Sequence, residues 1–171
     1  MNSIKKAVEK DFKILADLGK QTFIESHGKS APQKDIESYI NEKYSYSSLQ
    51  AELENAQNIY HIIYHEKTPV GFSKIVMNSP HSNIRLKNVT KLERIYILKN
   101  YYDKKLGAAL FDFNVQLSRA NSQAGMWLFV WKENLRAVRF YIKHSFKIVG
   151  SYDFPISETH SNPNHQMFLE Y

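Results

Sequence analysis

The hydrophobic and polar positions divide the chain into a helical first third and a strand-rich remainder. A short strand is expected over residues 3–8, and Asp11 then opens a helix as its N-cap, because apolar residues follow it at spacings of three and four. Two further helices are expected, one over residues 32–44 and one from a capping box at Ser47 and Gln50 to about Ala56. Most of the helical segments therefore precede most of the strands.

From residue 59 onward the pattern changes to period two and to β-forming residues. The expected strands are Ile59–His65, Val70–Met77, Thr90–Leu98, Gly125–Trp131, Phe146–Phe154 and His165–Tyr171. Helices are expected over Lys104–Ser122 and Asn134–His144, and polar loops over 78–88 and 155–164. Strand–helix–strand units late in this order predict an α/β fold with a mixed sheet, helices on both faces and one domain over residues 1–171.

Composition narrows the class of protein. The 171 residues, 43% of them hydrophobic, suffice for one globular domain with its own core. Cysteine is absent, which excludes disulfides, thiolate metal sites and cysteine nucleophiles. The first ten residues are charged and hold no apolar signal segment, and no run approaches the roughly 18 apolar residues of a membrane span. A cytoplasmic protein without a membrane partner is therefore expected.

The net charge of +6 at pH 7 attracts polyanions, either nucleic acid or a phosphate-rich cofactor. The sequence has no RNA-recognition signature, no zinc-finger spacing and no clear helix-turn-helix, so no nucleic-acid partner is expected. A metal site is not expected either. His61 and His65 fall on a predicted strand, where they lie too far apart to share a metal ion, and no HExxH motif is present.

The first candidate site lies between Asn100 and Gly107, where a strand leads into a helix. A helix N-terminus presents free backbone N–H groups and the positive end of the helix dipole, so it binds anions. Lys104 and Lys105 add positive charge, and Gly107 leaves room for a phosphate to approach. The alternative is an ordinary strand–helix turn with solvated lysines.

The second candidate site is the helix that begins near Asn134. Asn134 and Tyr141 are seven residues apart, which places an amide and a phenol on one helical face, roughly 10 Å apart along the axis. Each residue also has a structural alternative. Asn134 is a good N-cap, and Tyr141 fits a core aromatic with a satisfied hydroxyl.

Together these segments resemble the two cofactor motifs of the GNAT superfamily of N-acetyltransferases. The first motif, Gln/Arg-x-x-Gly-x-Gly/Ala, aligns with Tyr102–Gly107. The second, Asn-x-x-Ala-x-x-Phe-Tyr-x-x-x-Gly-Phe, corresponds to Asn134, Ala137, Phe140, Tyr141, Ser145 and Phe146, and the strand Leu92–Ile97 resembles the central strand of the family. Three residues depart from the pattern: Tyr102 replaces Gln or Arg, and Lys105 and Ser145 each replace a glycine.

The resemblance implies a mostly antiparallel sheet of about seven strands and acetyl-CoA as the co-substrate. It assigns pantetheine binding to the main chain of Ile95, Tyr96 and Ile97 and to Asn134, with the Ile97 N–H polarising the thioester carbonyl. It assigns the pyrophosphate to backbone N–H groups of Lys104, Lys105, Leu106, Gly107 and Ala108. The implied reaction is direct attack of a primary amine on the thioester in a ternary complex.

Two side chains receive catalytic roles from the resemblance. Tyr141 matches the general acid that protonates the leaving thiolate, and it also contacts the cofactor. Glu93 is the candidate base for the amine, directly or through a water; its alternative is a surface carboxylate paired with Arg94 or Lys91. The acceptor pocket is expected over roughly Phe23–Tyr46, with Tyr152 and the 155–165 loop.

Residues 88–146 are also similar to bacterial spermidine/spermine acetyltransferases. A polyamine would be received by carboxylates, for which the candidates are Glu25, Asp35, Glu37 and Glu93, although the net charge of +6 opposes a polycationic substrate. Other readings are a CoA-binding regulator without catalysis and an acetyltransferase for a protein N-terminus or lysine. The resemblance also allows a homodimer.

Overall fold

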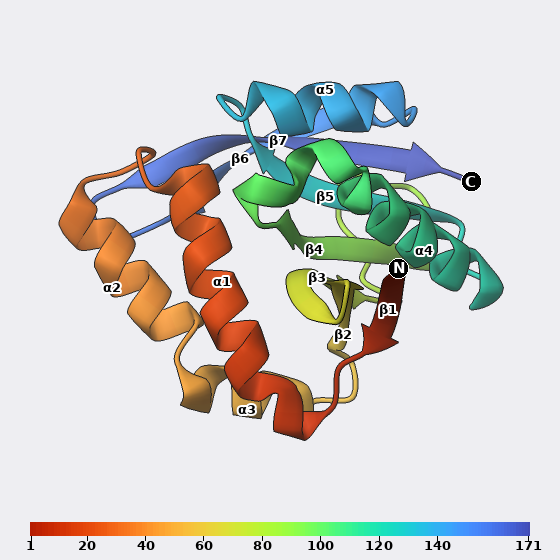
Figure 1. The fold of residues 1–171 in the computed structure, drawn as a ribbon. Coiled ribbons are helices and arrows are strands. Elements are labelled where there is room, and N and C mark those ends of the chain that lie inside the picture. Colours follow the sequence, from red (N-terminus) through yellow and green to blue (C-terminus); the bar gives the residue numbers. More distant parts are fainter.

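The computed structural model describes all residues from 1 to 171, and a twisted seven-stranded sheet forms its centre (Figure 1). The strands are β1 (Asn2–Lys6), β2 (Ile59–His65), β3 (Thr68–Val76), β4 (Val89–Ile97), β5 (Gly125–Trp131), β6 (Lys147–Pro155) and β7 (Ser161–Glu170). Their order is β1-β2-β3-β4-β5-β7-β6, and every neighbouring pair is antiparallel except β4 and β5. The predicted mixed, mostly antiparallel sheet is confirmed.

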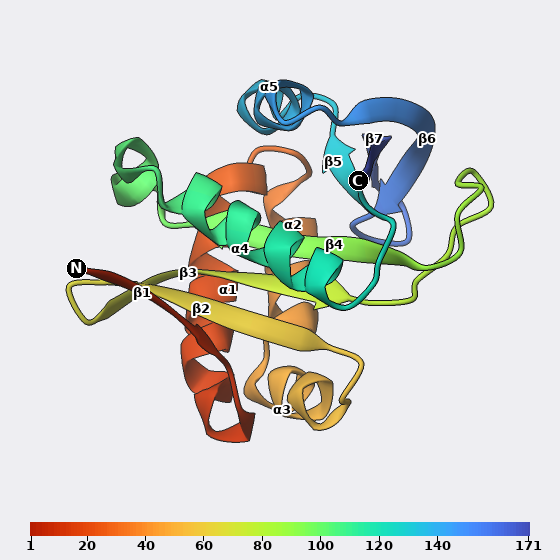
Figure 2. The ribbon, with the colours of Figure 1, turned by 90° about the vertical axis from the view of Figure 1, so that its right-hand side faces the viewer.

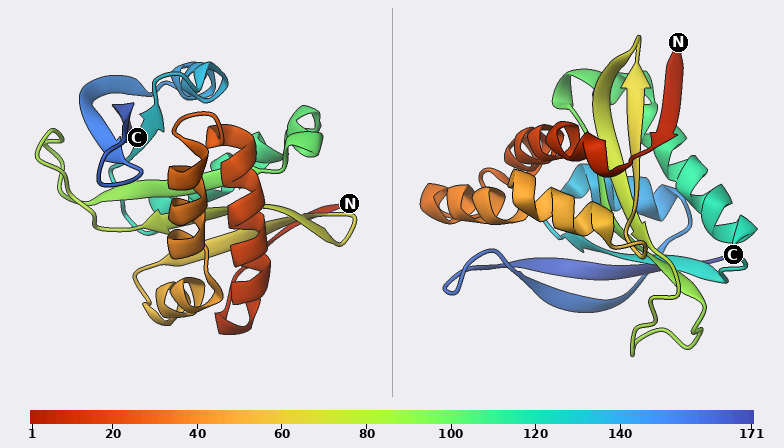
Figure 3. Two further views of the ribbon diagram at one scale, coloured as in Figure 1. Left: turned by 90° about the vertical axis from the view of Figure 1, so that its left-hand side faces the viewer. Right: turned by 90° about the horizontal axis from the view of Figure 1, so that it is seen from below.

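The helices cover both faces of this sheet, as predicted. Figure 3 shows α1 (Phe12–His27), α2 (Gln33–Lys43) and α3 (Tyr46–Glu54) on one face. Figure 2 shows α4 (Leu106–Ala120) in front of the other face, with α5 (Leu135–Lys143) above it. Short 3-10 turns at Glu9–Asp11 and Lys99–Lys104 lead into α1 and α4. None of the helices is both long and apolar enough to cross a membrane.

Alternation along β2 explains why the sheet carries a core on each side. Tyr60 and Ile62 are buried in the cluster that the first three helices form, together with Leu15 of α1. Ile63 points the other way, into a cluster with Leu106 and Leu110 of α4. Because successive side chains of a strand face opposite sides, an apolar strand of this kind needs helices on both faces.

The expected loop over 155–164 is largely wrong. β6 continues to Pro155 and β7 already begins at Ser161, so that only residues 156–160 connect them. The polar residues 161–164 are read as a loop from the sequence, yet Asn162 and Asn164 pair with Phe154 and Tyr152 of β6 and are buried. Their polar side chains line a cleft, which is why the strand lacks the usual apolar pattern.

Of two predicted helix starts, one has the predicted N-cap residue and the other does not. Asp11 is the N-cap residue of α1, as predicted, but its side chain caps no N–H group of this helix; its carboxylate accepts a hydrogen bond from the Val8 N–H at 2.9 Å. The N-cap of α3 is Ser45, whose Oγ accepts from the Ser48 N–H at 3.1 Å, so the predicted box at Ser47 does not form. At the start of α3 three serines, at positions 45, 47 and 48, compete for one cap, and packing decides among them.

Candidate active site

The sheet opens between β4 and β5. These parallel strands pair only at their beginnings, where Val89, Thr90 and Lys91 face Gly125, Met126 and Trp127. Beyond this point β4 stays paired with β3 and β5 with β7, but residues 92–97 and 128–131 do not pair with each other. The facing edges therefore carry backbone N–H and C=O groups without partners in the sheet, which a bound molecule can satisfy.

A β-bulge marks the point where the strands separate. Lys74 and Ile75 are consecutive on β3, yet they pair with Arg94 and Leu92, so Glu93 is the extra residue on β4. A bulge of this kind bends the strand and turns its side chains locally. The bend carries the end of β4 away from β5.

The direction of the N–H groups at the end of β4 follows from one hydrogen bond. The Leu98 N–H donates to the Val70 carbonyl at 2.9 Å. Because N–H directions alternate along a strand, the N–H groups of Ile95 and Ile97 point toward the gap, whereas that of Tyr96 points toward β3. Tyr96 thus contributes its side chain to the gap, and Ile95 and Ile97 contribute main-chain groups.

A cleft of about 790 Å³ occupies this opening and reaches both faces of the sheet. Among the predicted site residues, those that line it are Glu93, Ile95, Tyr96, Ile97, Lys105, Gly107, Ala108, Asn134 and Tyr141. Lys104 and Leu106 do not line it, because Lys104 is exposed and the Leu106 side chain is buried beneath α4. The structure thus brings most of the predicted residues to one cavity.

The start of α4 presents a row of free donors to the cleft. Lys105 has φ 56° and ψ 17°, and α4 begins directly after it. The backbone N–H groups of Lys105, Leu106, Gly107 and Ala108 have no acceptor within α4, as at the start of any α-helix, because its first bond runs from the Ala109 N–H to the Lys105 carbonyl at 3.1 Å. Four free donors at the positive end of a helix dipole form an anion site.

Gly107 is not required by the packing of the protein itself. A Cβ at this position would meet only Ile97 Cγ1, at the ordinary contact distance of 3.6 Å, and the residue has no positive φ. Helical glycine costs stability relative to alanine. The absence of a side chain at Gly107 therefore leaves room beside the N–H groups at the start of α4, where an anion can approach.

Positive side chains surround this anion site. Lys105, Arg136, Arg139 and Lys143 line the same cleft. The guanidinium carbon of Arg136, from α5, lies 3.5 Å from the centroid of the Tyr102 ring. Sequence reasoning missed Arg136 and Arg139; the signal was their spacing of three residues on the helix that also carries Tyr141.

Asn134 has the structural role that the sequence left open. Its Oδ1 accepts a hydrogen bond from the Ala137 N–H at 3.3 Å, so Asn134 is the N-cap of α5. The residue also lines the cleft, and its amide Nδ2 donates no hydrogen bond within the chain. The cap thus fixes an amide donor at the edge of the opening.

Tyr141 is buried between aromatic rings. Its ring packs against Phe111, Phe140 and Phe146, while its hydroxyl has no hydrogen-bond partner in the chain and the residue lines the cleft. Burial raises the pKa of the Tyr141 phenol above its ordinary value, against a smaller opposing effect of Arg136. The hydroxyl is therefore protonated at neutral pH and available as a donor.

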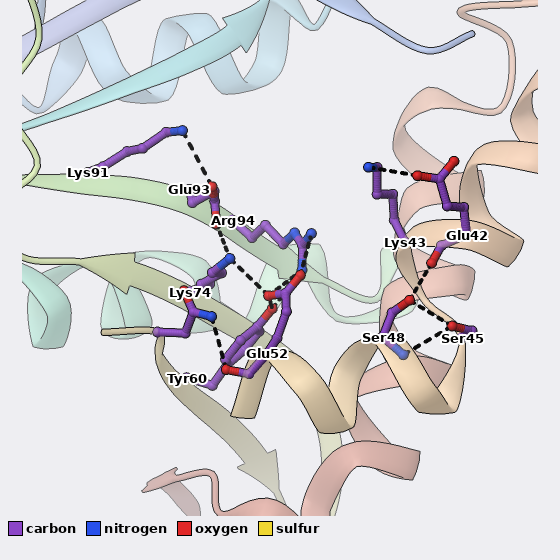
Figure 4. A network of polar contacts seen from close by, with 11 residues as sticks. Glu42, Lys43, Ser45, Ser48, Glu52, Tyr60, Lys74, Lys91, Glu93 and Arg94 are labelled. Atoms are coloured by element: carbon purple, nitrogen blue, oxygen red, sulfur yellow. Dashed lines mark hydrogen bonds and ion pairs between the residues drawn. The ribbon is translucent and has the colours of Figure 1, made fainter. Parts of the chain in front are cut away.

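Glu93 takes part in a buried ionic network, shown in Figure 4. Lys74 bridges Glu93 and Glu52, with its Nζ 2.8 Å from Glu52 Oε2, and Lys91 lies 3.4 Å from Glu93 Oε1. Arg94 pairs instead with Glu52 and donates to the Tyr60 hydroxyl at 2.6 Å. The sequence offered Arg94 or Lys91 as ion-pair partners of Glu93. The structure has the pair with Lys91, and it adds Lys74, a partner that was not predicted.

This network keeps Glu93 ionised. Burial acts to raise the pKa of Glu93, but the positive charges of Lys74, Lys91 and Arg94 outweigh it and hold that pKa below its ordinary value. The same balance of burial against Arg94 and Lys74 lowers the pKa of Glu52. Both carboxylates are charged at neutral pH, and both are already neutralised by the protein.

The other end of the cleft is aromatic. Phe23, Tyr39, Tyr44, Tyr96, Phe129, Trp131 and Phe154 line it, together with His27, Asn162 and Asn164. The predicted pocket over 23–46 is therefore present in part, but Tyr152 does not line the cleft and stacks on Phe129 from outside. His27 is a residue that sequence reasoning did not single out.

The carboxylates expected to receive a polyamine do not gather in the cleft. Glu25, Asp35 and Glu37 are not among its lining residues. Glu25 accepts a hydrogen bond from the Lys99 N–H at 2.7 Å, and Glu37 accepts from the Gln33 amide at 2.7 Å. Of the four carboxylates, only Glu93 therefore lines the cavity.

The two histidines of β2 do not converge. The ring of His61 packs against Phe113, with centroids 4.8 Å apart, whereas His65 contacts Tyr101 and Asn2. No group of three or more His, Cys, Asp or Glu side chains is arranged to hold a metal ion.

Comparison with known proteins assigns this architecture. The model of the acetyltransferase (GNAT) family matches residues 21–146. A protein of Lactobacillus delbrueckii subsp. lactis described as an uncharacterised N-acetyltransferase is 23% identical over 150 residues, covering 88% of this chain and 87% of that protein. The spermidine N(1)-acetyltransferase of Thermoplasma acidophilum is 24% identical over 149 residues, covering 85% and 88%.

Solved structures share the fold. The PaiA N-acetyltransferase of Thermoplasma acidophilum, solved with coenzyme A, superposes with a TM-score of 0.79 and 22% identity, covering 100% of this chain and 99% of that one. The match of the family model spans both motifs and the strands that open between them. This chain is therefore an acetyltransferase of the GNAT family.

Proposed function

We propose that the chain, acting as one domain, transfers an acetyl group from acetyl-CoA to the primary amine of a small molecule. One observation carries the proposal: the opening between β4 and β5 and the start of α4, with Lys105, Gly107 and Ala108, line one cleft. The first feature offers unpaired backbone groups to an amide-containing arm, and the second offers donors to a pyrophosphate. Acetyl-CoA combines both parts.

The surroundings fit this co-substrate. Gly107 leaves the helix start uncovered, and Lys105 and Arg136 supply charge beside it. Along the opening, the N–H groups of Ile95 and Ile97 and the Asn134 amide are placed to bind the pantetheine arm. The Ile97 N–H is our candidate for holding the thioester oxygen as negative charge develops there.

The proposed reaction needs no covalent enzyme intermediate. The amine nitrogen attacks the thioester carbon, the C–N bond forms, and the C–S bond breaks to release a thiolate. Tyr141 is the candidate acid for this thiolate, because its protonated hydroxyl faces the cleft without a partner in the chain. Glu93 stays a candidate for holding the acceptor ammonium or a water, although its ion pair with Lys74 makes it a weak base.

A polyamine acceptor is the second candidate. The spermidine acetyltransferase among the relatives favours it. The charge of the cleft opposes it. Eight Lys or Arg side chains line the cleft, against two carboxylates, Glu52 and Glu93, and both carboxylates are already paired with Lys74. A compact amine with an apolar or aromatic body suits the ring-lined end better than an extended polycation.

The test is calorimetric titration with acetyl-CoA, followed by a free-thiol release assay over an amine panel. The panel includes spermidine, aromatic monoamines, amino acids and peptides that present an N-terminus or a lysine. Binding with thiol release confirms the transferase and ranks the acceptors, and Tyr141→Phe should then slow turnover without weakening binding. Binding without release from any amine would instead favour a CoA-binding regulator, and no binding would overturn the proposal.

A further inference from the structure

His27 occupies a position that the reaction above does not use. It is the last residue of α1, and its ring stacks on Phe23 with centroids 4.8 Å apart. The same ring lies 6.1 Å from Tyr96 of β4 and 5.6 Å from Trp131 of β5. These are residues of the two strands beyond the point where they separate, so the imidazole sits across the open end of the sheet.

The hydrogen bonds of Ser26 determine which ring nitrogen carries the proton. The Ser26 Oγ lies 2.8 Å from the Thr22 carbonyl oxygen and 2.7 Å from His27 Nδ1. A carbonyl oxygen only accepts, so the single hydroxyl hydrogen of Ser26 is used there. The contact with Nδ1 then requires that Nδ1 carries the hydrogen and donates to Ser26.

The other nitrogen is left as a lone pair in the cleft. His27 Nε2 has no hydrogen-bond partner in the chain and is not fully enclosed by it, and His27 lines the cavity. Burial lowers the pKa of His27 to about 4, and no charged side chain contributes to that shift. The imidazole is thus neutral at physiological pH and presents an acceptor to the cleft.

We propose that His27 is a catalytic residue that takes the proton of the attacking amine on Nε2, while Ser26 holds the imidazole in the required tautomer. This inference rests on the proposed acetyl transfer. As the C–N bond forms, the nitrogen becomes positively charged and strongly acidic, so even a weak base such as this imidazole accepts its proton. The C–S bond breaks and Tyr141 protonates the thiolate. His27 then releases the amine proton to solvent in the open cleft, and the Tyr141 phenolate takes up a proton from that solvent, so that one proton moves from the amine to the thiol overall.

The anchoring of α1 supports a fixed role. Glu25, two residues before His27, accepts the Lys99 N–H at 2.7 Å and thereby ties the end of α1 to the turn that precedes α4. The imidazole and the free N–H groups of α4 are therefore positioned by the same contact. The position of His27, its tautomer and the exposure of Nε2 all favour the same role, as a proton acceptor in the cleft.

The first test compares His27→Phe with the native enzyme, using the best acceptor of the panel. Phenylalanine keeps the stack on Phe23 and removes the base. We expect turnover to fall about 100-fold at pH 7, a usual contribution of a general base, with unchanged calorimetric affinity for acetyl-CoA. The deficit should shrink as the pH falls through the His27 pKa of about 4, because a protonated imidazole can no longer accept the proton, whereas a purely structural role gives the same deficit at every pH.

A matched control and a second variant sharpen this result. His81→Phe replaces another partly buried histidine that packs on an aromatic ring, Trp127, outside the cleft, and it should leave turnover unchanged. Ser26→Ala keeps the imidazole but frees its tautomer, so a smaller loss is expected. Native turnover in His27→Phe, or a deficit independent of pH, would overturn the proposal.

Nitrogen-15 NMR of the free protein tests the tautomer without any substrate. The ring resonances that are lost in His27→Phe belong to His27. They should report a neutral imidazole with its proton on Nδ1, and the Ser26→Ala variant should show less of this tautomer. A proton on Nε2 would overturn the inference. This measurement needs no acceptor. It therefore still tests the tautomer of His27 if none of the amines in the panel leads to thiol release, an outcome that would count against the proposed acetyl transfer itself.

Discussion

The guanidinium of Arg136 stacks on the ring of Tyr102, with 3.5 Å between the guanidinium carbon and the ring centroid. Tyr102 occupies the place where the family motif has Gln or Arg. The stack brings a cation from α5 to the start of α4. The motif position itself is occupied by Tyr102, which carries no positive charge. The charge is thus supplied by a neighbouring helix.

Arg136→Ala should therefore weaken acetyl-CoA binding. A lost charge-assisted contact of about 1.5–3 kcal/mol corresponds to roughly a 10- to 100-fold higher Kd by calorimetry, with little change in thermal stability. Arg136→Lys is the matched control: it keeps the charge but loses the planar stack, so an intermediate Kd is expected. An unchanged Kd in Arg136→Ala would show that the stack serves packing alone.

Gly107→Ala should separate stability from binding. The added methyl group meets only Ile97 at 3.6 Å and removes a helical glycine, so the free energy of unfolding should rise by up to about 0.5–1 kcal/mol. The same methyl group covers the free N–H groups, and the Kd for acetyl-CoA should rise. Gly19→Ala is the contrast, since its Cβ would lie 2.1 Å from the Tyr44 ring and should destabilise the fold.

Ser145→Gly should stabilise the protein. Ser145 follows α5 with φ 69°, in the left-handed region that glycine adopts without strain, and it replaces a glycine of the family motif. Relief of about 1–2 kcal/mol of strain exceeds the entropic cost of glycine, which leaves a gain of about 0.5–1 kcal/mol in chemical denaturation. Ser151→Gly, in the exposed β6 strand, should instead lower stability. A loss in Ser145→Gly would contradict the argument.

Lys74→Met should destabilise the fold strongly. Lys74 bridges Glu52 and Glu93 and is almost fully buried, so its removal leaves two carboxylates with less compensation. Breaking a buried pair costs about 3–5 kcal/mol, which a thermal melt would show as a fall on the order of 10 °C. Lys43→Met removes an exposed pair with Glu42 and should change stability by less than about 1 kcal/mol.

Mild acid should destabilise the protein through its buried histidines. Burial lowers the pKa values of His27 and His61 to about 4, from 6.5 for an unperturbed histidine. Between pH 6.5 and 4 the unfolded chain binds protons that the folded chain does not, so stability is full above pH 6.5 and falls as the pH decreases through this window. Replacing the buried His61 by Leu should make the melting temperature less dependent on pH there; an unchanged dependence would exclude His61 as a cause.

Most of the fold was predictable because it rests on local periodicity. The strands at 59–65 and 125–131 have the predicted bounds, since an uninterrupted apolar or alternating pattern admits one reading. Residues 161–164 were misread because their polar side chains serve a cleft rather than a loop. The cap expected at Ser47 is at Ser45 instead, because neighbouring serines compete for the same helix end.

The site was predictable only as far as its motifs extend. Asn134, Tyr141 and Gly107 lie within contiguous motifs, and all three line the cleft. The partners Glu52 and Lys74 come from α3 and β3, far from Glu93 in the sequence, and no spacing rule connects them. His27 likewise gains its meaning from its contacts with Tyr96 and Trp131, which only the fold creates.

The three residue pairs that join β4 to β5 have a mechanical consequence. They are the whole of the ladder between strands β1–β4 and strands β5–β7, so the sheet consists of two halves that share a short seam. A co-substrate that hydrogen-bonds to both open edges would supply the missing rungs. Amide protons of Ile95 and Ile97 would then exchange more slowly with solvent, and the two halves would move as one body while the acetyl group is in place.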